Sequence, residues 1–437
     1  FCWSLPREVS ETGYKDRFRM PRILIVRTEG SPFGTRLARV MRTIRETGWN
    51  CHVICAEGSV SQGTVDGSVL DLREQITIYE FPVPDGLGSR LYRWITGAGY
   101  LGSRHFRKCL KARLAENAYD AIMVKDSPIL HSVFKVLDRN REKDPPVVCE
   151  MVEPRVAQAH DSLFRYGTWV AKIGGYFRRI VPRLRAVERE CLPRCDRIFT
   201  VVDEMKTWLT NTYELDPNRI SVVQNTPVLS ELDAIQEPGV PPKMSQRVSF
   251  VGSFGPHRGL ESLIDAAALV RQQQPACPDF QLAIVGGSPA QVRRLESLCA
   301  DRGISDITEL VPKVSHRLAI QWMKESDIGV IPHVDTLGIR TTVPFKLFDY
   351  MAVGAACLVS DVGPLGRIIR KTNAGLVFQP GSVADLAEKL GCLLGDKQNT
   401  SAMGRRGRWH AERGLCWEIE SEKYSQYLAS ITSATDS

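Results

Sequence analysis

The chain has 437 residues, of which 43% are hydrophobic and 24% charged, and this mixture excludes collagen-like, coiled-coil and disordered chains. At roughly 150 residues per domain, the length predicts two or three domains and excludes a single small binding module. The formal net charge is +7, and no uncharged apolar stretch approaches the roughly 18 residues that a membrane-spanning helix needs.

Residues 1–19 mix basic and acidic side chains without an apolar segment, so they do not resemble a secretory signal. We treat them as an N-terminal extension, with Met20 as a candidate start of the native chain. From there, short β-branched runs alternate with helical patterns, which is typical of parallel sheets. The strands expected in the first half are residues 22–27, 51–55, 76–80, 120–124, 146–151, 197–202 and 220–223.

A proline-rich stretch, residues 229–246, indicates an interdomain linker. A second set of strands is expected at residues 247–251, 280–285, 306–311, 328–332, 356–360 and 375–378, and residues 409–431 are expected to be helical. The prediction is therefore an α/β fold of two Rossmann-like, doubly wound domains. Ligands of such folds bind in the crevice at the carboxyl ends of the strands.

The cysteines argue against a metal site. There are 12 of them, and the closest pairs, Cys51 with Cys55 and Cys191 with Cys195, have no matching second pair nearby. Zinc sites usually repeat a two-residue spacing, so we expect no metal. Scattered thiols are typical of the reducing cytosol, which predicts a cytoplasmic protein.

Phosphate chemistry is predicted in the second half. The loop at residues 28–34 lacks the G-x-G-x-x-G pattern, and the chain has no Walker A sequence, which disfavours hydride transfer and P-loop chemistry. After residues 247–251 the chain reads Gly252-Ser-Phe-Gly-Pro-His-Arg258-Gly259, and a helix is expected from Leu260. Glycines allow close backbone approach, a helix start offers N–H groups, and Arg258 offers a fork of donors. A plain strand-to-helix loop is the alternative.

The stronger signal is the segment Pro344-Phe-Lys346-Leu-Phe-Asp349. A helix that begins near Pro344 or Phe345 has Lys346 in its first turn and Asp349 on the same face one turn later. A cation in the first turn opposes the helix dipole, so its presence indicates a bound anion.

The strings at residues 248–259 and 344–361 and the terminal Trp417 helix resemble family 4 glycosyltransferases, also called glycosyltransferases group 1, which have the GT-B fold. The likeness runs from Met20 to about Leu428. It implies an acceptor-binding domain at residues 20–228, a nucleotide-sugar domain at 247–415, and a C-terminal helix at 416–437 that crosses back to the first domain.

The resemblance also implies roles for donor-side residues. Arg258 and Lys346 match cations that bind the diphosphate, and Asp349 matches the second acid of the family's two-glutamate signature, which binds the ribose. Thr341 occupies the place of the first glutamate, so the contact to the transferred sugar departs from the family pattern. The remaining residues assigned to the donor site are Gly34, Ser253, Gly255 and Thr342.

The acceptor side carries weaker signals. No histidine matches the one that many relatives keep in the first domain. Asp126 and Glu153 lie at strand ends and are candidates for orienting an acceptor hydroxyl, with helix caps or solvated residues as the alternative. His333 follows a strand of the second domain and is a third candidate.

Basic and aromatic residues cluster in the first half. Residues 20–244 carry 32 basic and 27 acidic side chains, whereas residues 245–437 carry 21 and 20. Residues 86–115 contain seven basic side chains and no acid, and a second basic stretch covers residues 178–185. A solvated helix face and peripheral attachment to an anionic membrane surface are equally supported. No recognition motif accompanies the charge, so nucleic acid is not an expected partner.

Together these features predict a retaining glycosyltransferase that moves a sugar from UDP- or GDP-sugar to an acceptor hydroxyl. The family implies a saccharide or lipid-linked saccharide acceptor, as in surface polysaccharide or glycoconjugate synthesis, and no cofactor. Two alternatives stay open: a GT-B sugar-nucleotide epimerase, and an inactive partner subunit, which the Thr341 departure motivates.

Overall fold

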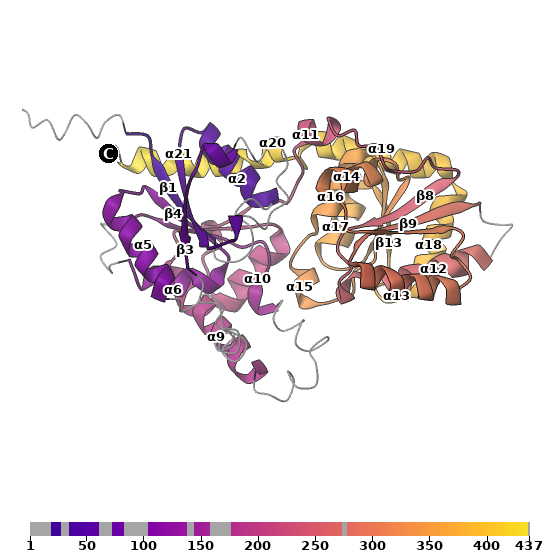
Figure 1. Cartoon of the computed structure of the whole chain (residues 1–437), viewed down its shortest axis with the longest axis horizontal. Helices are drawn as coiled ribbons and strands as arrows, with labels where there is room; N and C mark the ends of the chain where they lie inside the picture. Colours follow the sequence, from indigo (N-terminus) through magenta and orange to yellow (C-terminus); the bar gives the residue numbers. More distant parts are fainter. Residues whose placement is uncertain are drawn as a thin grey trace, which may run out of the picture.

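The computed structural model describes residues 19–27, 35–60, 72–82, 104–137, 144–157, 176–272 and 278–435. Within these ranges the chain forms two α/β lobes that lie side by side along the long axis (Figure 1). In the described part of the chain, no helix combines the length and the apolar character needed to cross a membrane.

The first lobe is built on a seven-stranded parallel sheet. Its order is β3-β2-β1-β4-β5-β6-β7. The strands are β1 (Arg22–Arg27), β2 (Asn50–Ala56), β3 (Thr77–Phe81), β4 (Ala121–Lys125), β5 (Val147–Glu150), β6 (Arg197–Thr200) and β7 (Ile220–Val222). The main helices are α2 (Thr35–Glu46), α5 (Arg104–Glu116), α6 (Leu130–Phe134), α9 (Tyr176–Cys191) and α10 (Asp203–Tyr213). The central strands are almost wholly buried because helices cover both sheet faces.

The second lobe has a six-stranded parallel sheet in the order β10-β9-β8-β11-β12-β13. Its strands are β8 (Gln246–Val251), β9 (Phe280–Gly287), β10 (Thr308–Pro312), β11 (Ile328–Ile331), β12 (Ala356–Ser360) and β13 (Gly375–Phe378). Its helices are α12 (Leu260–Gln272), α13 (Pro289–Asp301), α14 (His316–Lys324), α15 (Leu337–Arg340), α16 (Phe345–Val353), α17 (Pro364–Thr372), α18 (Val383–Gly395) and α19 (Lys397–Arg413).

Two Rossmann-like lobes confirm the predicted fold class. In both sheets the strand order reverses at the first strand, which is the pattern of doubly wound folds. Each predicted strand is present, with ends displaced by at most two residues. The apolar runs located the strands correctly because parallel strands are buried on both faces.

Two predicted segments differ from the structure. The stretch taken as a linker contains a short helix, α11 (Leu229–Asp233), whose Asp233 accepts hydrogen bonds from Arg408 at 2.7 and 2.8 Å. The stretch expected to be helical, residues 409–431, is helical but divided among three helices. α19 ends at Arg413, and α20 (Trp417–Glu420) and α21 (Glu422–Thr435) follow. The break occurs where the chain crosses between lobes, since the Trp417 amide donates to Pro227 O of the first lobe at 2.7 Å.

The last helix packs on the first lobe. α21 runs beside α2 in Figure 1, and Tyr424 and Leu428 share a buried core with Leu37 and Met41. The indole N–H of Trp417 donates to Thr43 Oγ1 at 3.1 Å. The chain therefore crosses between the lobes twice, through α11 and through α20.

Candidate active site

The candidate site is a cavity of about 280 Å³ between the lobes. Thr35 and Arg39 of α2 line it from the first lobe. From the second lobe it is lined by residues 251–253, Arg258, His316, Ala319, Ile320, Met323, His333, Ile339, 342–346 and Asp349. These residues lie in loops at the carboxyl ends of β8 and β11 and on α14, α15 and α16, where doubly wound folds bind their ligands.

Lys346 lies in the first turn of α16, which begins at Phe345 after the N-cap residue Pro344. Its side chain is buried, and Nζ lies 3.5 Å from the ring centroid of Phe250 without a hydrogen-bond partner among the described residues. A Cβ at Gly252, whose φ is +137°, would lie 2.7 Å from Nζ. Burial first, and Arg258 second, hold the pKa of Lys346 well below its usual value. A nearby anion would offset both effects.

Arg258 is the second cation of the cavity, and it contacts His333. Its Nη1 donates to His333 Nε2 at 2.9 Å, while Arg258 Nε is buried without a partner in the described chain. Because a guanidinium only donates, the His333 ring is neutral with its proton on Nδ1. Burial, followed by the charge of Arg258, holds the pKa of His333 well below its usual range. Glu153 of the first lobe acts electrostatically on Arg258 and opposes the effect of burial on the pKa of Arg258.

Asp349 lies one turn after Lys346 on α16 and is 6% exposed. Burial raises the pKa of its carboxyl to about 6, although Arg39 and Lys346 favour the charged form. The cavity therefore has two cations with unmatched donors at one end and a carboxylate one helical turn away. A diphosphate followed by a sugar hydroxyl matches that order of charges.

Comparison with known families agrees with this geometry. Residues 245–396 match the family model described as glycosyl transferases group 1, and residues 33–226 match the glycosyl transferase 4-like domain. The chain belongs to the group 1 glycosyltransferases. The expected family is confirmed, and residues 227–244, which lie between the two matches, also lie between the last strand of the first sheet and the first strand of the second.

Curated relatives of this group 1 glycosyltransferase match over part of their length. The D-inositol 3-phosphate glycosyltransferase of Nocardia farcinica is 29% identical over 246 residues, which cover 54% of this chain and 52% of that protein. A protein of the same name from Jonesia denitrificans is 26% identical over 252 residues, or 54% of this chain and 58% of that protein. The chain thus spans about half the length of the curated relatives that it matches.

Solved structures share the fold. Sucrose-phosphate synthase from Thermosynechococcus elongatus aligns with a TM-score of 0.71 at 16% identity, over 95% of this chain and 100% of the other. HepE of Anabaena in complex with UDP and glucose aligns with a TM-score of 0.63 at 16% identity, over 94% and 100%. The fold of the group 1 glycosyltransferase is therefore GT-B.

The other donor-side residues predicted from sequence differ in whether they line the cavity. Ser253 and Thr342 line the cavity, and the Thr342 hydroxyl also donates to Val152 O of the first lobe at 3.1 Å. Gly255 and Thr341 are described but do not line it: a Cβ at Gly255 would meet His257, and the Thr341 hydroxyl donates to Leu337 O at 2.8 Å. Gly34 lies outside the described residues.

Of the acceptor-side candidates, only His333 lines the cavity of the described chain. Asp126, with φ of +69°, is paired with Arg155 Nη2 at 2.8 Å and with Arg27 Nη1 at 3.6 Å. Glu153 lies close enough to Arg258 to act on its charge. Glu153 thus lies near the site, whereas Asp126 is held in ion pairs of the first lobe and does not line the cavity.

Sequence reasoning missed Arg39 and a buried charge network beside it. Glu150, at the end of β5, is fully buried and accepts from Arg36 Nε at 2.8 Å and from Lys125 Nζ at 2.6 Å. The hydroxyl of Tyr424, on α21, also donates to Glu150. The available signal was the pair Arg36 and Arg39 within the apolar face of α2, since unpaired arginines are rarely buried.

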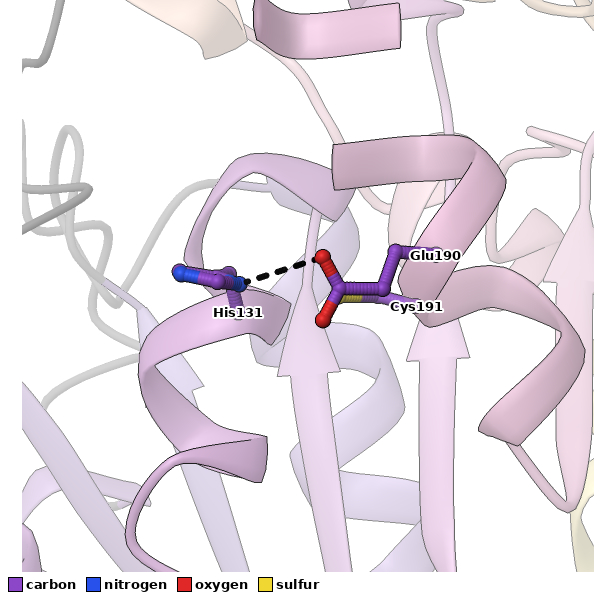
Figure 2. Close-up of side chains that lie close together, drawn as sticks. All are labelled: His131, Glu190 and Cys191. Carbon is purple, nitrogen blue, oxygen red and sulfur yellow. Dashed lines mark ion pairs between the residues drawn. The ribbon is translucent and has the colours of Figure 1, made fainter. Parts of the chain in front are cut away.

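A separate cluster lies between α6 and α9 (Figure 2). His131, Glu190 and Cys191 have donor atoms within 4.8 Å of one another, and His131 Nδ1 is 3.7 Å from Glu190 Oε2. Burial raises the pKa of the Cys191 thiol to about 12, so it carries no charge at neutral pH. A histidine–glutamate contact beside a buried thiol accounts for the group, and the expected absence of a metal site stays a prediction.

Proposed function

We propose that the protein transfers a sugar from a UDP- or GDP-sugar to an acceptor hydroxyl with retention of configuration at the anomeric carbon. The observation that carries the proposal is the pair Lys346, in the first turn of α16, and Arg258, in the turn before α12. Both line the cavity, and each has a buried nitrogen without a partner in the described chain. Burying such charges is costly unless an anion neutralises them. The diphosphate of a nucleotide sugar supplies that anion.

In this proposal the cations act mainly in the transition state. The bond between the sugar and the diphosphate breaks, and negative charge grows on the departing oxygen. Lys346 and Arg258 stabilise this charge from fixed positions, which is electrostatic catalysis by preorganised donors. The acceptor proton passes to a departing phosphate oxygen, so the proposal requires no metal and no dedicated base.

His333 has a positioning role in this scheme. Its neutral Nε2 accepts from Arg258, which fixes the guanidinium toward the cavity without adding a competing positive charge. Asp349 holds the ribose hydroxyls one turn along α16. Thr341 does not reach the cavity, so Thr342, which lines it, takes the sugar-side position instead.

The acceptor assignment rests on the family and on the first lobe. We infer a lipid-linked saccharide presented at an anionic membrane surface, because the group often glycosylates such acceptors and the basic excess lies in the first half. The name of the curated relatives suggests a phosphorylated polyol as a second candidate.

The first test is a substitution at Lys346. Nucleotides are screened by thermal stabilisation, where UDP, GDP or ADP at 100 times its dissociation constant adds about 2.7 kcal/mol. With the matching donor, Lys346→Ala should lower turnover on the order of a hundredfold, as for loss of one oxyanion donor. Lys371→Ala, on the exposed side of α17, is the control. Near-normal turnover of Lys346→Ala would refute the assignment.

The same preparation separates the alternatives. Slow release of free sugar from the donor, without acceptor, indicates a competent transferase. Conversion of the donor to an epimer indicates the epimerase, and nucleotide binding with neither reaction indicates an inactive partner subunit.

A further inference from the structure

Arg39 is a first-lobe residue whose side chain lines the donor cavity between the lobes. It lies on α2, is 8% exposed, and its Nη1 donates to Thr226 O at 2.6 Å. Its guanidinium carbon lies 5.9 Å from the ring centroid of Phe345, the first residue of α16. The backbone of Thr226 and the ring of Phe345 thus hold the guanidinium in the cleft.

A second cavity, also of about 280 Å³, places Arg39 within the site. It borders α11 and shares a wall with the donor cavity made of Arg39, His316, Ile320 and Asp349. Lys346 and Arg258 line the donor cavity but not the second one. Arg39 and Asp349 therefore lie together at the end of the donor cavity away from the phosphate-binding cations.

Arg39 and Asp349 interact electrostatically without a direct ion pair. Each is the strongest favourable charge acting on the other, yet Arg39 has its single hydrogen bond within the described chain to Thr226 O. A guanidinium offers five donors, so donors remain on Arg39, and an ionised carboxylate only accepts. A hydroxyl between them can donate to Asp349 and accept from Arg39, and a ribose carries two such hydroxyls.

We propose that Arg39 binds the ribose of the donor nucleotide from the first lobe, opposite Asp349 of the second. The inference rests on the proposed function, since it assumes a nucleoside diphosphate in the donor cavity. The other charged groups of the donor site, Lys346, Arg258 and Asp349, belong to the second lobe. Arg39 therefore joins the two lobes through the ligand, and donor binding favours the closed arrangement.

The test uses calorimetric titration of the whole chain with whichever of UDP, GDP and ADP binds, and with its 2′-deoxy and 3′-deoxy forms. We expect Arg39→Gln to bind the ribonucleotide about tenfold more weakly, as for loss of a charge-assisted hydrogen bond. For the deoxy form that lacks the contacted hydroxyl, Arg39→Gln and wild type should agree within about twofold. Arg45→Gln is the matched control, because Arg45 is on the same helix and donates to Asn50 Oδ1.

Two results would overturn the role of Arg39: unchanged ribonucleotide binding by Arg39→Gln, or an equal loss for the ribonucleotide and both deoxy forms. If circular dichroism shows that Arg39→Gln is unfolded, Arg39→Met, which keeps the apolar stem beside Phe345, is judged by the same criteria. Wild type that binds none of the three nucleotides would instead refute the proposed function, so the two failures are distinguishable.

Discussion

At the scale of single residues, the site is distinguished by basic side chains whose donors are not all paired within the described chain. Lys346 is buried and Arg258 half-buried, and each has an unmatched donor in the described chain, whereas the fully buried Glu150 is held by Arg36, Lys125 and Tyr424. Burial raises the pKa of Glu150, but Lys125 and Arg36 outweigh this and lower it to about 2. A paired buried charge is typical of structure, and an unpaired one indicates a ligand.

Asp349 gives a pH-dependent prediction, because burial raises its pKa to about 6. The ionised carboxylate accepts from ribose more strongly than the protonated carboxyl does, so affinity should be constant well above pH 6 and fall by at most about tenfold per pH unit below it. A UDP- or GDP-sugar is the probe, since its esterified diphosphate does not titrate there. The measurement is calorimetric titration between pH 5 and pH 8.

The Asp349→Asn variant provides the control, because its affinity for the nucleotide sugar should not change between pH 5 and pH 8. A fall of the same size in Asp349→Asn would assign the titration to another group. The pH dependence of folding stability has the opposite sign to the pH dependence of nucleotide affinity. A raised carboxyl pKa in the folded state means that the contribution of Asp349 to stability falls as the pH rises from about 4 to about 6.

At the scale of elements, two helices have distinct roles: α16 lines the cavity, and α21 packs on the first lobe. α16 supplies Lys346 and Asp349 one turn apart, so its start fixes the spacing between the diphosphate and ribose positions. α21 supplies no cavity residue in the described chain, yet its Tyr424 hydroxyl reaches Glu150 at the end of β5. The C-terminal helix thereby contributes to the buried charge network at the end of β5.

Tyr424→Phe tests that support. Removing the hydroxyl deletes one hydrogen bond to a buried carboxylate, and we expect the free energy of unfolding to fall by about 1.5–3 kcal/mol. Urea unfolding measures the change. Tyr427→Phe is the matched control on the same helix, because Tyr427 contacts Arg197 through its ring, and it should cost less than about 0.5 kcal/mol. Equal losses would show that the Tyr424 hydroxyl has no special role.

At the scale of the whole molecule, a few contacts connect the lobes beside the cleft. Arg367 of α17 pairs with Glu204 of α10 through Nε–Oε1 at 2.6 Å and Nη2–Oε2 at 2.9 Å. Thr342 donates to Val152 O nearer the cavity. Where the chain crosses between the lobes, Arg408 of α19 forms an ion pair with Asp233 of α11. The contacts between the lobes thus include polar pairs, which domain motion can break, in addition to an apolar cluster with residues of both lobes.

Arg367→Ala should shift the chain toward a more open arrangement without unfolding either lobe. The pair is partly exposed, so it contributes about 0.2–1 kcal/mol, and the ratio of closed to open chains should fall by at most about fivefold. Small-angle X-ray scattering checks this as a larger radius of gyration, with a smaller difference at high salt. Arg370→Ala, whose partner Asp361 is in its own lobe, should leave the radius unchanged. An unchanged radius for Arg367→Ala would mean that the pair does not restrain the lobes.

The sequence by itself determined the fold class, the strands, and five donor-side residues that do line the cavity: Ser253, Arg258, Thr342, Lys346 and Asp349. These features can be predicted because buried parallel strands appear in the sequence as short apolar runs, and because a lysine in the first turn of a helix is a local sequence feature. Only the tertiary structure revealed Arg39, the Glu150 network and the positions of Thr341 and Gly255 outside the cavity. The contacts of Arg39 and Glu150 join side chains and backbone that lie more than a hundred residues apart in the chain, as Arg36 and Glu150 do, and no local sequence pattern predicts such a contact.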